Sequence, residues 1–240
     1  MYNFDGLRVL ADIPRQQAKL RGNSTALIYE GRSTTYAAFD KYTSQVANGL
    51  IALGAKPQAR IGYMGKNSDV FFETLLGASK ANCVLVGVNW RLAGPEVEYI
   101  LNDAGAEIMF VGSDFAPLIE KVKANCPKLK HVIAVDGGHS SWPAYQAWRD
   151  KQKDSDPKLK IADEDDAIQL YTSGTTGHPK GVQLTNANYL SFFQAATDAK
   201  WGEFDAGDPN LIAMPNFHVA GTNMGLTTLA QGSLGIIVKE

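Results

Sequence analysis

The first 150 residues repeat one theme, in which a short apolar run is followed by a turn and then by a segment with helical periodicity. This alternation is typical of βα units that build a mostly parallel sheet. It predicts strands at 61–64, 84–88, 108–111 and 132–135, helices opening at Ser68 and Pro95, a helix over 116–124, and a hairpin (26–29 and 34–36) before a helix that ends at Gly54. We therefore expect an α/β protein with doubly wound, mostly parallel sheets and flanking helices.

A charged stretch interrupts this pattern. Residues 151–166 read KQKDSDPKLKIADEDD, and this density of charge around Pro157 favours an exposed connection. We predict a first subdomain over 1–151, a linker over 152–166 and the start of a second subdomain over 167–240. The acidic cluster at 163–166 lacks the spaced oxygen ligands and the glycine of a calcium loop, so it is interpreted as a solvated linker end.

The part after the linker begins with a strand and a loop. A strand is predicted at 167–171, a glycine- and threonine-rich loop at 173–181, and a second strand at 182–184. A helix follows over 187–197, with Thr185 or Asn186 as its cap, and another helical segment follows His218. The chain ends in an apolar run at 235–238, which we interpret as a strand without its covering helix.

Composition excludes several classes of partner and location. The 240 residues are 45% hydrophobic and carry a formal net charge of -2, so there is no broad basic field for nucleic acid. No apolar run approaches the roughly 20 residues needed to span a bilayer. The start, MYNFDGLRVL, lacks a basic leader, which favours the cytoplasm and leaves peripheral membrane association open. Cys83 and Cys126 are predicted to be buried, without a disulfide framework.

The loop from Thr172 to Gly181, TSGTTGHPKG, carries the most chemical information. Its glycines permit backbone amides to converge on an anion, its hydroxyls add donors, and Lys180 adds a compact positive charge. Such a loop suits a polyphosphate. The spacing differs from the Walker loop, because Pro179 precedes the lysine and a glycine follows it, and there is no G-x-G-x-x-G fingerprint. A plain surface turn is the alternative interpretation.

The segment YTSGTTGHPKG resembles the phosphate loop of the adenylate-forming superfamily, which includes acyl- and aryl-CoA synthetases, luciferases and peptide-synthetase adenylation domains. Two further stretches are similar to family segments: Asn89-Trp90-Arg91-Leu92 with Pro95-Glu96 and Tyr99-Ile100-Leu101, and Met214-Pro215-Asn216-Phe217-His218-Val219-Ala220-Gly221. The resemblance implies that the substrates are ATP, CoA and a carboxylic acid, with Mg²⁺ as cofactor. The acid would attack the α-phosphate of ATP to form an acyl-adenylate, and the CoA thiol would then displace AMP.

The resemblance also implies roles for particular residues. The ATP phosphates would be held by Thr172, Ser173, Gly174, Thr175, Thr176, Gly177 and Lys180, and the acyl pocket would include Phe217, His218 and Gly221. His218 is equally consistent with a helix cap and with a gate near the acyl carboxylate. Asn216 stands where relatives often carry a bulky apolar residue. No residue of the chain is implied as a direct metal ligand, and a homodimer is compatible with the family.

Complete members of this superfamily are longer and supply later elements that this sequence does not contain, among them a catalytic lysine. We therefore expect the chain to be an N-terminal part of an acyl-CoA synthetase, with no catalytic residue of its own and negligible ligase activity alone. Two alternatives stay open: a short nucleotide-binding or interaction module, and a sister enzyme such as an aryl-CoA ligase or an amino-acid adenylation domain. Phe217-His218, together with the lack of a recognisable amino-group anchor, favours a carboxylic acid substrate, in first place a fatty acid.

Overall fold

Two β-sheets form in the computed structural model, which describes residue 4 and residues 6–172, 178–200 and 208–240. The larger sheet has the order β6 (His131–Ala134), β5 (Ile108–Val111), β3 (Arg60–Met64), β4 (Val84–Gly87), β7 (Asp166–Thr172) and β8 (Lys180–Thr185). The smaller has the order β2 (Arg32–Thr35), β1 (Thr25–Tyr29), β10 (Leu234–Ile237) and β9 (Pro209–Ile212). Neighbouring strands are parallel except in the pairs β1–β2 and β7–β8. The predicted fold class is confirmed.

Both sheets combine strands from the two sides of the charged 152–166 segment. In the smaller sheet Ile28 of β1 pairs with Ile236 of β10, and in the larger sheet Val86 of β4 pairs with Gln169 of β7. Residues 1–151 and 167–240, which we predicted as separate subdomains, therefore share both sheets.

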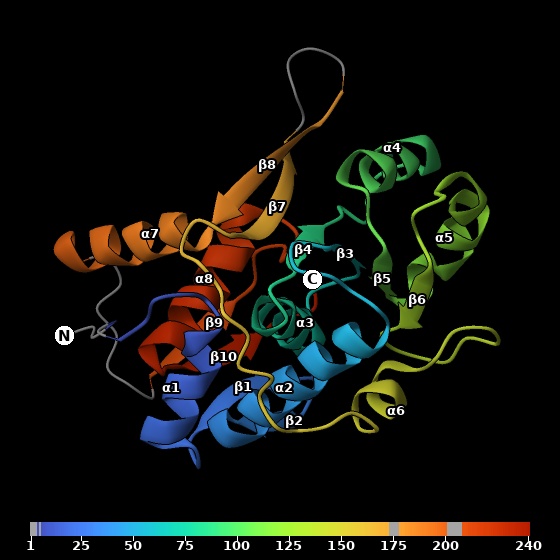
Figure 1. Cartoon of the computed structure of the whole chain (residues 1–240). Helices are drawn as coiled ribbons and strands as arrows, with labels where there is room; N and C mark the ends of the chain where they lie inside the picture. The colour runs from blue at the N-terminus through green and yellow to red at the C-terminus, as the bar shows by residue number, and fades with distance from the viewer. Residues whose placement is uncertain (1–3, 5, 173–177, 201–207) are drawn as a thin grey trace.

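The helices lie in layers around the sheets (Figure 1). The outer face of the larger sheet is covered by α4 (Gly94–Ala104) and α5 (Ala116–Val122). On its other face α3 (Asp69–Lys80) contacts β4, β7 and also β1 of the smaller sheet, next to α2 (Tyr36–Ala52) and α8 (Val219–Gln231). The remaining helices of the described residues are α1 (Asp12–Arg21), α6 (Tyr145–Arg149), α7 (Asn186–Asp198) and two 3-10 turns, Ser113–Phe115 and Lys123–Asn125.

Helix ends agree with the capping signals in the sequence. The hydroxyl of Ser68 accepts a hydrogen bond from the Phe71 amide at the start of α3, and the hydroxyl of Thr185 accepts one from the Asn188 amide at the start of α7. Gly105 ends α4 with a φ of 67°, a left-handed conformation that favours glycine. Cys83 and Cys126 are both free and buried, as predicted.

The 152–166 segment is more firmly attached than the sequence analysis predicted. The amide Nδ2 of Asn48 donates to the carbonyl oxygens of Lys153 and Ser155, both at 2.8 Å. Asp166 at the end of the acidic cluster forms an ion pair with Arg60 at 2.8 Å. The interpretation of this cluster as merely solvated is wrong for Asp166, because the first residue of β7 lies within reach of Arg60 at the start of β3 in the same sheet. Within the described residues, no helix is long and apolar enough to cross a bilayer.

Candidate active site

The β7–β8 hairpin projects from the body of the molecule (Figure 1). Its strands pair so that Thr172 at the end of β7 lies opposite Lys180 at the start of β8, and both residues are exposed. These two predicted phosphate ligands are therefore brought together by backbone pairing. The other predicted ligands, Ser173, Gly174, Thr175, Thr176 and Gly177, lie outside the described residues.

The base of the hairpin is held by side chains. The Tyr171 hydroxyl donates to Oδ2 of Asp103 on α4 at 2.5 Å and accepts from Nε2 of Gln169 at 3.0 Å. Burial, followed by the hydrogen bond to the Asp103 carboxylate, raises the pKa of Tyr171. Gln169 in turn accepts from Nε of Arg60 at 3.2 Å. A row of hydrogen bonds thus runs from the sheet across the hairpin to α4.

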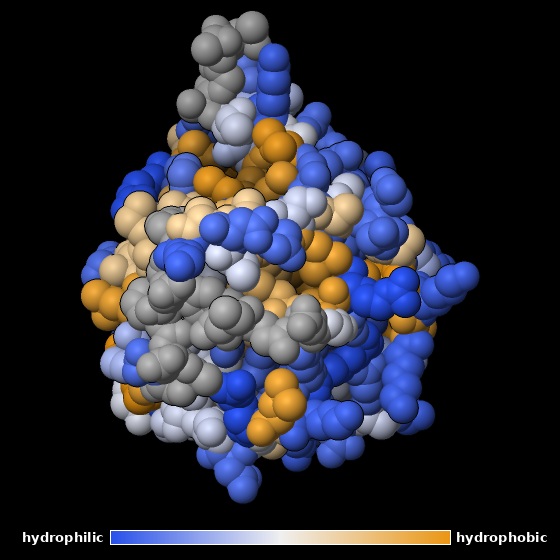
Figure 2. Space-filling model, turned by 90° about the vertical axis from the view of Figure 1, so that its left-hand side faces the viewer, coloured by the Kyte–Doolittle hydropathy of each residue, from blue (hydrophilic) through white to orange (hydrophobic). Residues whose placement is uncertain are grey.

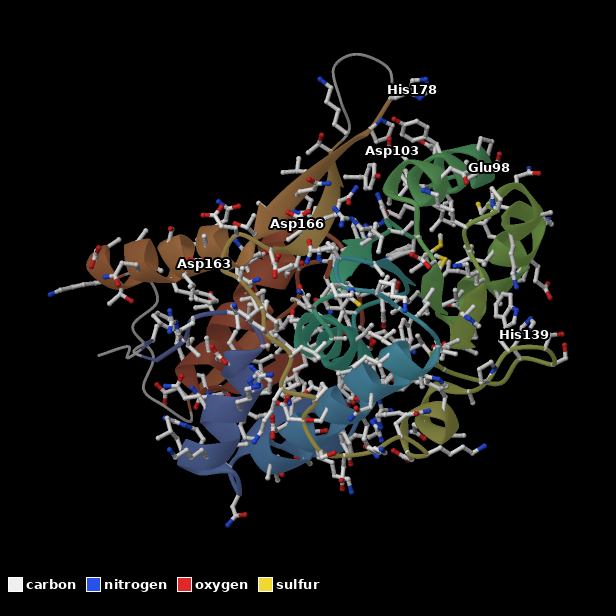
Figure 3. The ribbon with its side chains drawn as sticks, viewed as in Figure 1. Glu98, Asp103, His139, Asp163, Asp166 and His178 are labelled. Atoms are coloured by element: carbon white, nitrogen blue, oxygen red, sulfur yellow. The ribbon has the colours of Figure 1, made fainter. Side chains whose placement is uncertain are left out.

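A ring contact joins the other strand of the hairpin to the same helix. The imidazole of His178 stacks on the ring of Tyr99, with ring centroids 4.9 Å apart and an angle of 23° between the planes. In Figure 3 Asp103 and His178 lie near each other where α4 meets the hairpin, and Glu98 lies further along the helix. Tyr99 lies in a stretch whose resemblance to the family carried no role for it, and Asp103 and Gln169 were not identified, because contacts between a helix and a distant strand leave no local pattern in the sequence.

A cavity of about 490 Å³ opens beside the hairpin. Figure 2 shows apolar surface below the projecting tip. The cavity walls are mainly apolar, and a few polar groups stand among them. The apolar walls include Leu92, Ile100, Leu170, Val182, Leu184, Phe217 and Val219, and the polar groups are those of Asn89, Tyr171, Thr172 and His218. A mainly apolar cavity with a few convergent polar groups is the usual form of a small-molecule site.

Of the two roles that the sequence left open for His218, the helix cap is confirmed and the gate near an acyl carboxylate stays a prediction. His218 is the N-cap of α8, where its Nδ1 accepts from the Ala220 amide at 3.3 Å, and it also lines the cavity. The backbone of Phe217 passes directly over Gly87 at the end of β4, where an added Cβ would lie 3.1 Å from the Phe217 carbonyl oxygen. The strand end and the start of α8 are therefore in close contact at the cavity.

Two other residues of the 214–221 motif, Asn216 and Gly221, are packed against neighbouring segments. Asn216 is only 2% exposed, and its backbone N–H donates to Oδ1 of Asn67 at 2.8 Å. A Cβ on Gly221 would lie 2.3 Å from the carbonyl oxygen of Pro215, so glycine permits the first turn of α8 to pack on the preceding segment. The described residues that line the cavity include Phe217 and His218 but neither Gly221 nor Asn216.

The donors around this cavity suit an anion more than a bare cation. Thr172 and His218 line the cavity with a hydroxyl and an imidazole, and exposed Lys180 is paired with Thr172 on the neighbouring strand without being a lining residue itself. Among the described residues there is no group of three or more His, Cys, Asp or Glu side chains placed to hold a metal ion. A second cavity, of about 270 Å³, lies at the carboxyl ends of β3, β5 and β6 and is lined by none of the predicted site residues.

Comparisons with known proteins agree with this arrangement. The model of the AMP-binding enzyme family matches residues 14–240. The chain is 36% identical over 234 residues to the fatty acid–acyl-carrier-protein ligase ScoC of Streptomyces coeruleorubidus, covering 93% of this chain and 44% of that protein. It is 30% identical over 229 residues to the feruloyl-CoA synthase of an Amycolatopsis species, covering 95% of this chain and 43% of that enzyme.

Solved structures show the same fold. The anthranilate CoA ligase AuaEII in complex with anthranoyl-AMP superposes with a TM-score of 0.89 at 27% identity, covering 100% of this chain and 45% of that one. The chain thus spans less than half the length of the curated relatives it matches. Fold, phosphate-loop motif and relatives together define an adenylate-forming ligase class. The chain belongs to the AMP-binding enzyme family, as the motif resemblance predicted.

Proposed function

We propose that these residues form part of an ATP-dependent acid–thiol ligase that activates a carboxylic acid, in first place a fatty acid. The observation that carries this proposal is the position of Thr172 at the mouth of an apolar cavity, directly opposite Lys180. A polyphosphate held at the strand ends would place its reactive end beside an apolar chain lying between Leu92, Leu184 and Val219. The many hydrocarbon side chains of this wall favour an aliphatic acid over an amino acid.

The reaction has two steps. In the first, a carboxylate oxygen of the acid attacks the α-phosphorus of ATP, the bond to the bridging oxygen breaks, and pyrophosphate leaves. In the second, a thiol sulfur attacks the acyl carbon, AMP leaves, and the thiol proton passes to solvent. Thr172 and Lys180 would orient the leaving pyrophosphate, since fixed donors stabilise developing charge without solvent rearrangement. Ser173, Thr175 and Thr176 would add further donors, and His218 would border the carboxylate.

Mg²⁺ would reach this site already bound to the nucleotide. The hydroxyl and ammonium donors of Thr172 and Lys180 fit phosphate oxygens, and Mg²⁺ in such sites is usually shared between substrate phosphates and one or two carboxylates. Its chemistry would be to offset negative charge on the phosphates. The residues of this chain bind, orient and exclude water from the reacting groups.

A second thiol acceptor is favoured by one specific comparison. The relative with 36% identity is a ligase that uses an acyl-carrier protein. The acceptor would then be a thiol carried by a protein instead of CoA, while the adenylation step would stay the same. Supplying either CoA or a loaded carrier protein to the enzyme after adenylation, and measuring which thioester forms, separates the two.

The adenylation step is tested by pyrophosphate exchange with an enzyme that contains residues 1–240, using fatty, aromatic and amino acids. We expect exchange with fatty acids, and a loss of about 10-fold or more in kcat/KM for ATP when Lys180 becomes alanine, because a charge-assisted phosphate contact contributes a few kcal/mol. Exchange with amino acids alone, or unchanged exchange in Lys180→Ala combined with Thr176→Ala, would contradict the proposal.

The 240-residue polypeptide is expected to bind MgATP weakly but to form no acyl-adenylate. The superfamily places its catalytic lysine and adenine contacts in later segments, which this polypeptide does not include. Incubating it with radiolabelled ATP and a fatty acid, and separating the products by thin-layer chromatography, should show ATP only. Robust acyl-adenylate formation by the polypeptide would refute this expectation.

A further inference from the structure

The β7–β8 hairpin needs support beyond the sheet. β8 is the edge strand and pairs with β7, and β7 pairs with β4 only as far as Leu170, so the strand ends that carry Thr172 and Lys180 extend past the rest of the sheet as a two-stranded ribbon. A two-stranded ribbon that projects from a sheet can twist and bend about its base. Phosphate recognition is sensitive to displacements of about 1 Å. A second point of attachment near the strand ends is therefore required for function at this site.

Helix α4 supplies that attachment to both strands. Tyr99 and Asp103 are four residues apart, so they lie on one face of the helix. Asp103 accepts from the Tyr171 hydroxyl at 2.5 Å, immediately before Thr172 on β7. Tyr99 stacks on His178, two residues before Lys180 on β8. The end of β7 and the segment just before β8 are thus each held next to a residue that is predicted to contact phosphate.

The helix is itself a firm support. Its inner side chains Val97, Ile100 and Leu101 are at most 1% exposed in the core between α4 and the larger sheet. The hydrogen-bonded row from Arg60 through Gln169 continues into Tyr171 and so into Asp103. Gly181 leaves the space for this row, since a Cβ there would lie 2.4 Å from Nε2 of Gln169.

We propose that Tyr99 and Asp103 are positioning residues that fix the strand ends bearing Thr172 and Lys180 in the geometry that ATP phosphates require. That the ligand is ATP rests on the proposed function. The restraint of the hairpin by Tyr99 and Asp103 does not depend on which ligand binds. They act through Tyr171 and His178.

The restraint is tested by amide hydrogen exchange on the 240-residue chain without ligand. The variants Tyr99→Ala and Asp103→Ala should speed exchange in peptides covering 166–172 and 178–185 by about 2- to 10-fold, the range for losing one modest contact. Tyr99→Phe keeps the ring and should exchange like the parent. Glu98→Ala is the matched control, because Glu98 lies on α4 as well but its carboxylate accepts a hydrogen bond from Nδ2 of Asn125 at 2.8 Å, outside the hairpin. Parental exchange in both alanine variants, with α4 peptides equally protected, would overturn the proposal.

The second measurement is the affinity of the same variants for MgATP, determined by calorimetry and by the ³¹P chemical shifts of the β- and γ-phosphorus. We expect the Kd to rise about 2- to 10-fold in Tyr99→Ala and Asp103→Ala and to return to the parental value in Tyr99→Phe. Faster hairpin exchange with an unchanged Kd would make the two residues merely structural and overturn their positioning role. A parent that does not bind MgATP would count against the proposed function, and hydrogen exchange would still decide the restraint.

Discussion

Glu73 shows how burial and pairing oppose each other at a single residue. Its carboxylate lies on α3 at 2% exposure and accepts hydrogen bonds from the Tyr145 hydroxyl at 2.6 Å and from Nη1 of Arg149 at 2.7 Å. Burial raises the pKa of Glu73 to about 7, although the charge of Arg149 and the hydrogen bond from Tyr145 work in the opposite direction. The cluster joins α6 to α3, and its stability depends on pH.

The stability of the chain is therefore expected to fall with rising pH through this group. The native carboxyl binds its proton more tightly than the unfolded one, so its contribution is complete below the ordinary pKa of 4.5 and is lost as pH rises through about 7. Urea unfolding of the parent and of Glu73→Gln should show a parental advantage that shrinks by on the order of 2 kcal/mol between pH 4.5 and 8. Glu164→Gln, at an exposed position, is the control. A pH-independent difference would contradict the assignment.

Gly181 is a glycine for reasons of space. An added Cβ would lie 2.4 Å from Nε2 of Gln169 and 3.0 Å from the Tyr171 ring, so alanine would push the amide away from the Tyr171 hydroxyl. We expect Gly181→Ala to lower the free energy of unfolding by about 1 kcal/mol, as overpacking does. Gly138→Ala, with no atom within 4 Å of its Cβ, should be nearly neutral in the same denaturation experiment. Equal stability of the two variants would mean that the Gln169 side chain moves aside without cost and would contradict this explanation for Gly181.

At the scale of elements, the charged 152–166 segment is fixed to two helices by ion pairs and hydrogen bonds. Asp156 accepts two hydrogen bonds from Arg15, at 2.7 and 3.0 Å, and one from the Lys158 amide at 2.7 Å. Partial burial alone would raise the pKa of Asp156, but these hydrogen bonds outweigh burial and lower the pKa to about 2. The buried ammonium group of Lys80 lies 3.6 Å from the same carboxylate. Asp156 thus ties residues of the connection to α1 and α3.

Replacing Asp156 by asparagine should destabilise the chain at neutral pH by about 1 kcal/mol, the scale of a charge-assisted hydrogen bond. Because the native pKa lies below the ordinary value of 3.8, this contribution is present above pH 3.8 and is lost as pH falls through about 2. The difference between parent and variant in urea unfolding should therefore vanish in acid. Asp154→Asn, whose side chain is 65% exposed, provides a neutral comparison. A difference as large at pH 2 as at neutral pH would exclude this ion pair as its source.

Individual elements could be predicted where the local signal was strong. β5 has the predicted bounds 108–111, because four apolar residues stand between turn signals, and α3 and α7 begin at the predicted hydroxyl caps. By contrast, α1 buries only Ile13, Pro14 and Gln17, and such a narrow and partly polar face gives little periodicity. The five-residue α6 is too short for a helical pattern to be recognised.

For the whole molecule, local patterns could define the class of fold but not which strands pair. The pairing of Leu27 with Gly235 depends on surfaces that form only when distant segments pack together. The phosphate motif could be recognised because its order is local, and the structure pairs Thr172 with Lys180, while their contact with ATP phosphates stays a prediction. The support from Tyr99 and Asp103 could not be predicted, because it requires knowing that α4 lies beside the hairpin.

The junction of β1 with β10 also has a consequence for synthesis on the ribosome. Strand β1 leaves the ribosome long before β10, its parallel neighbour, because most of these 240 residues lie between them. Until β10 emerges, the nascent hairpin of β1 and β2 presents an open hydrogen-bonding edge and the apolar side chains of Leu27 and Tyr29. An edge left open for so long is a site for premature association with other chains. The smaller sheet can close only once Ile237 has left the exit tunnel.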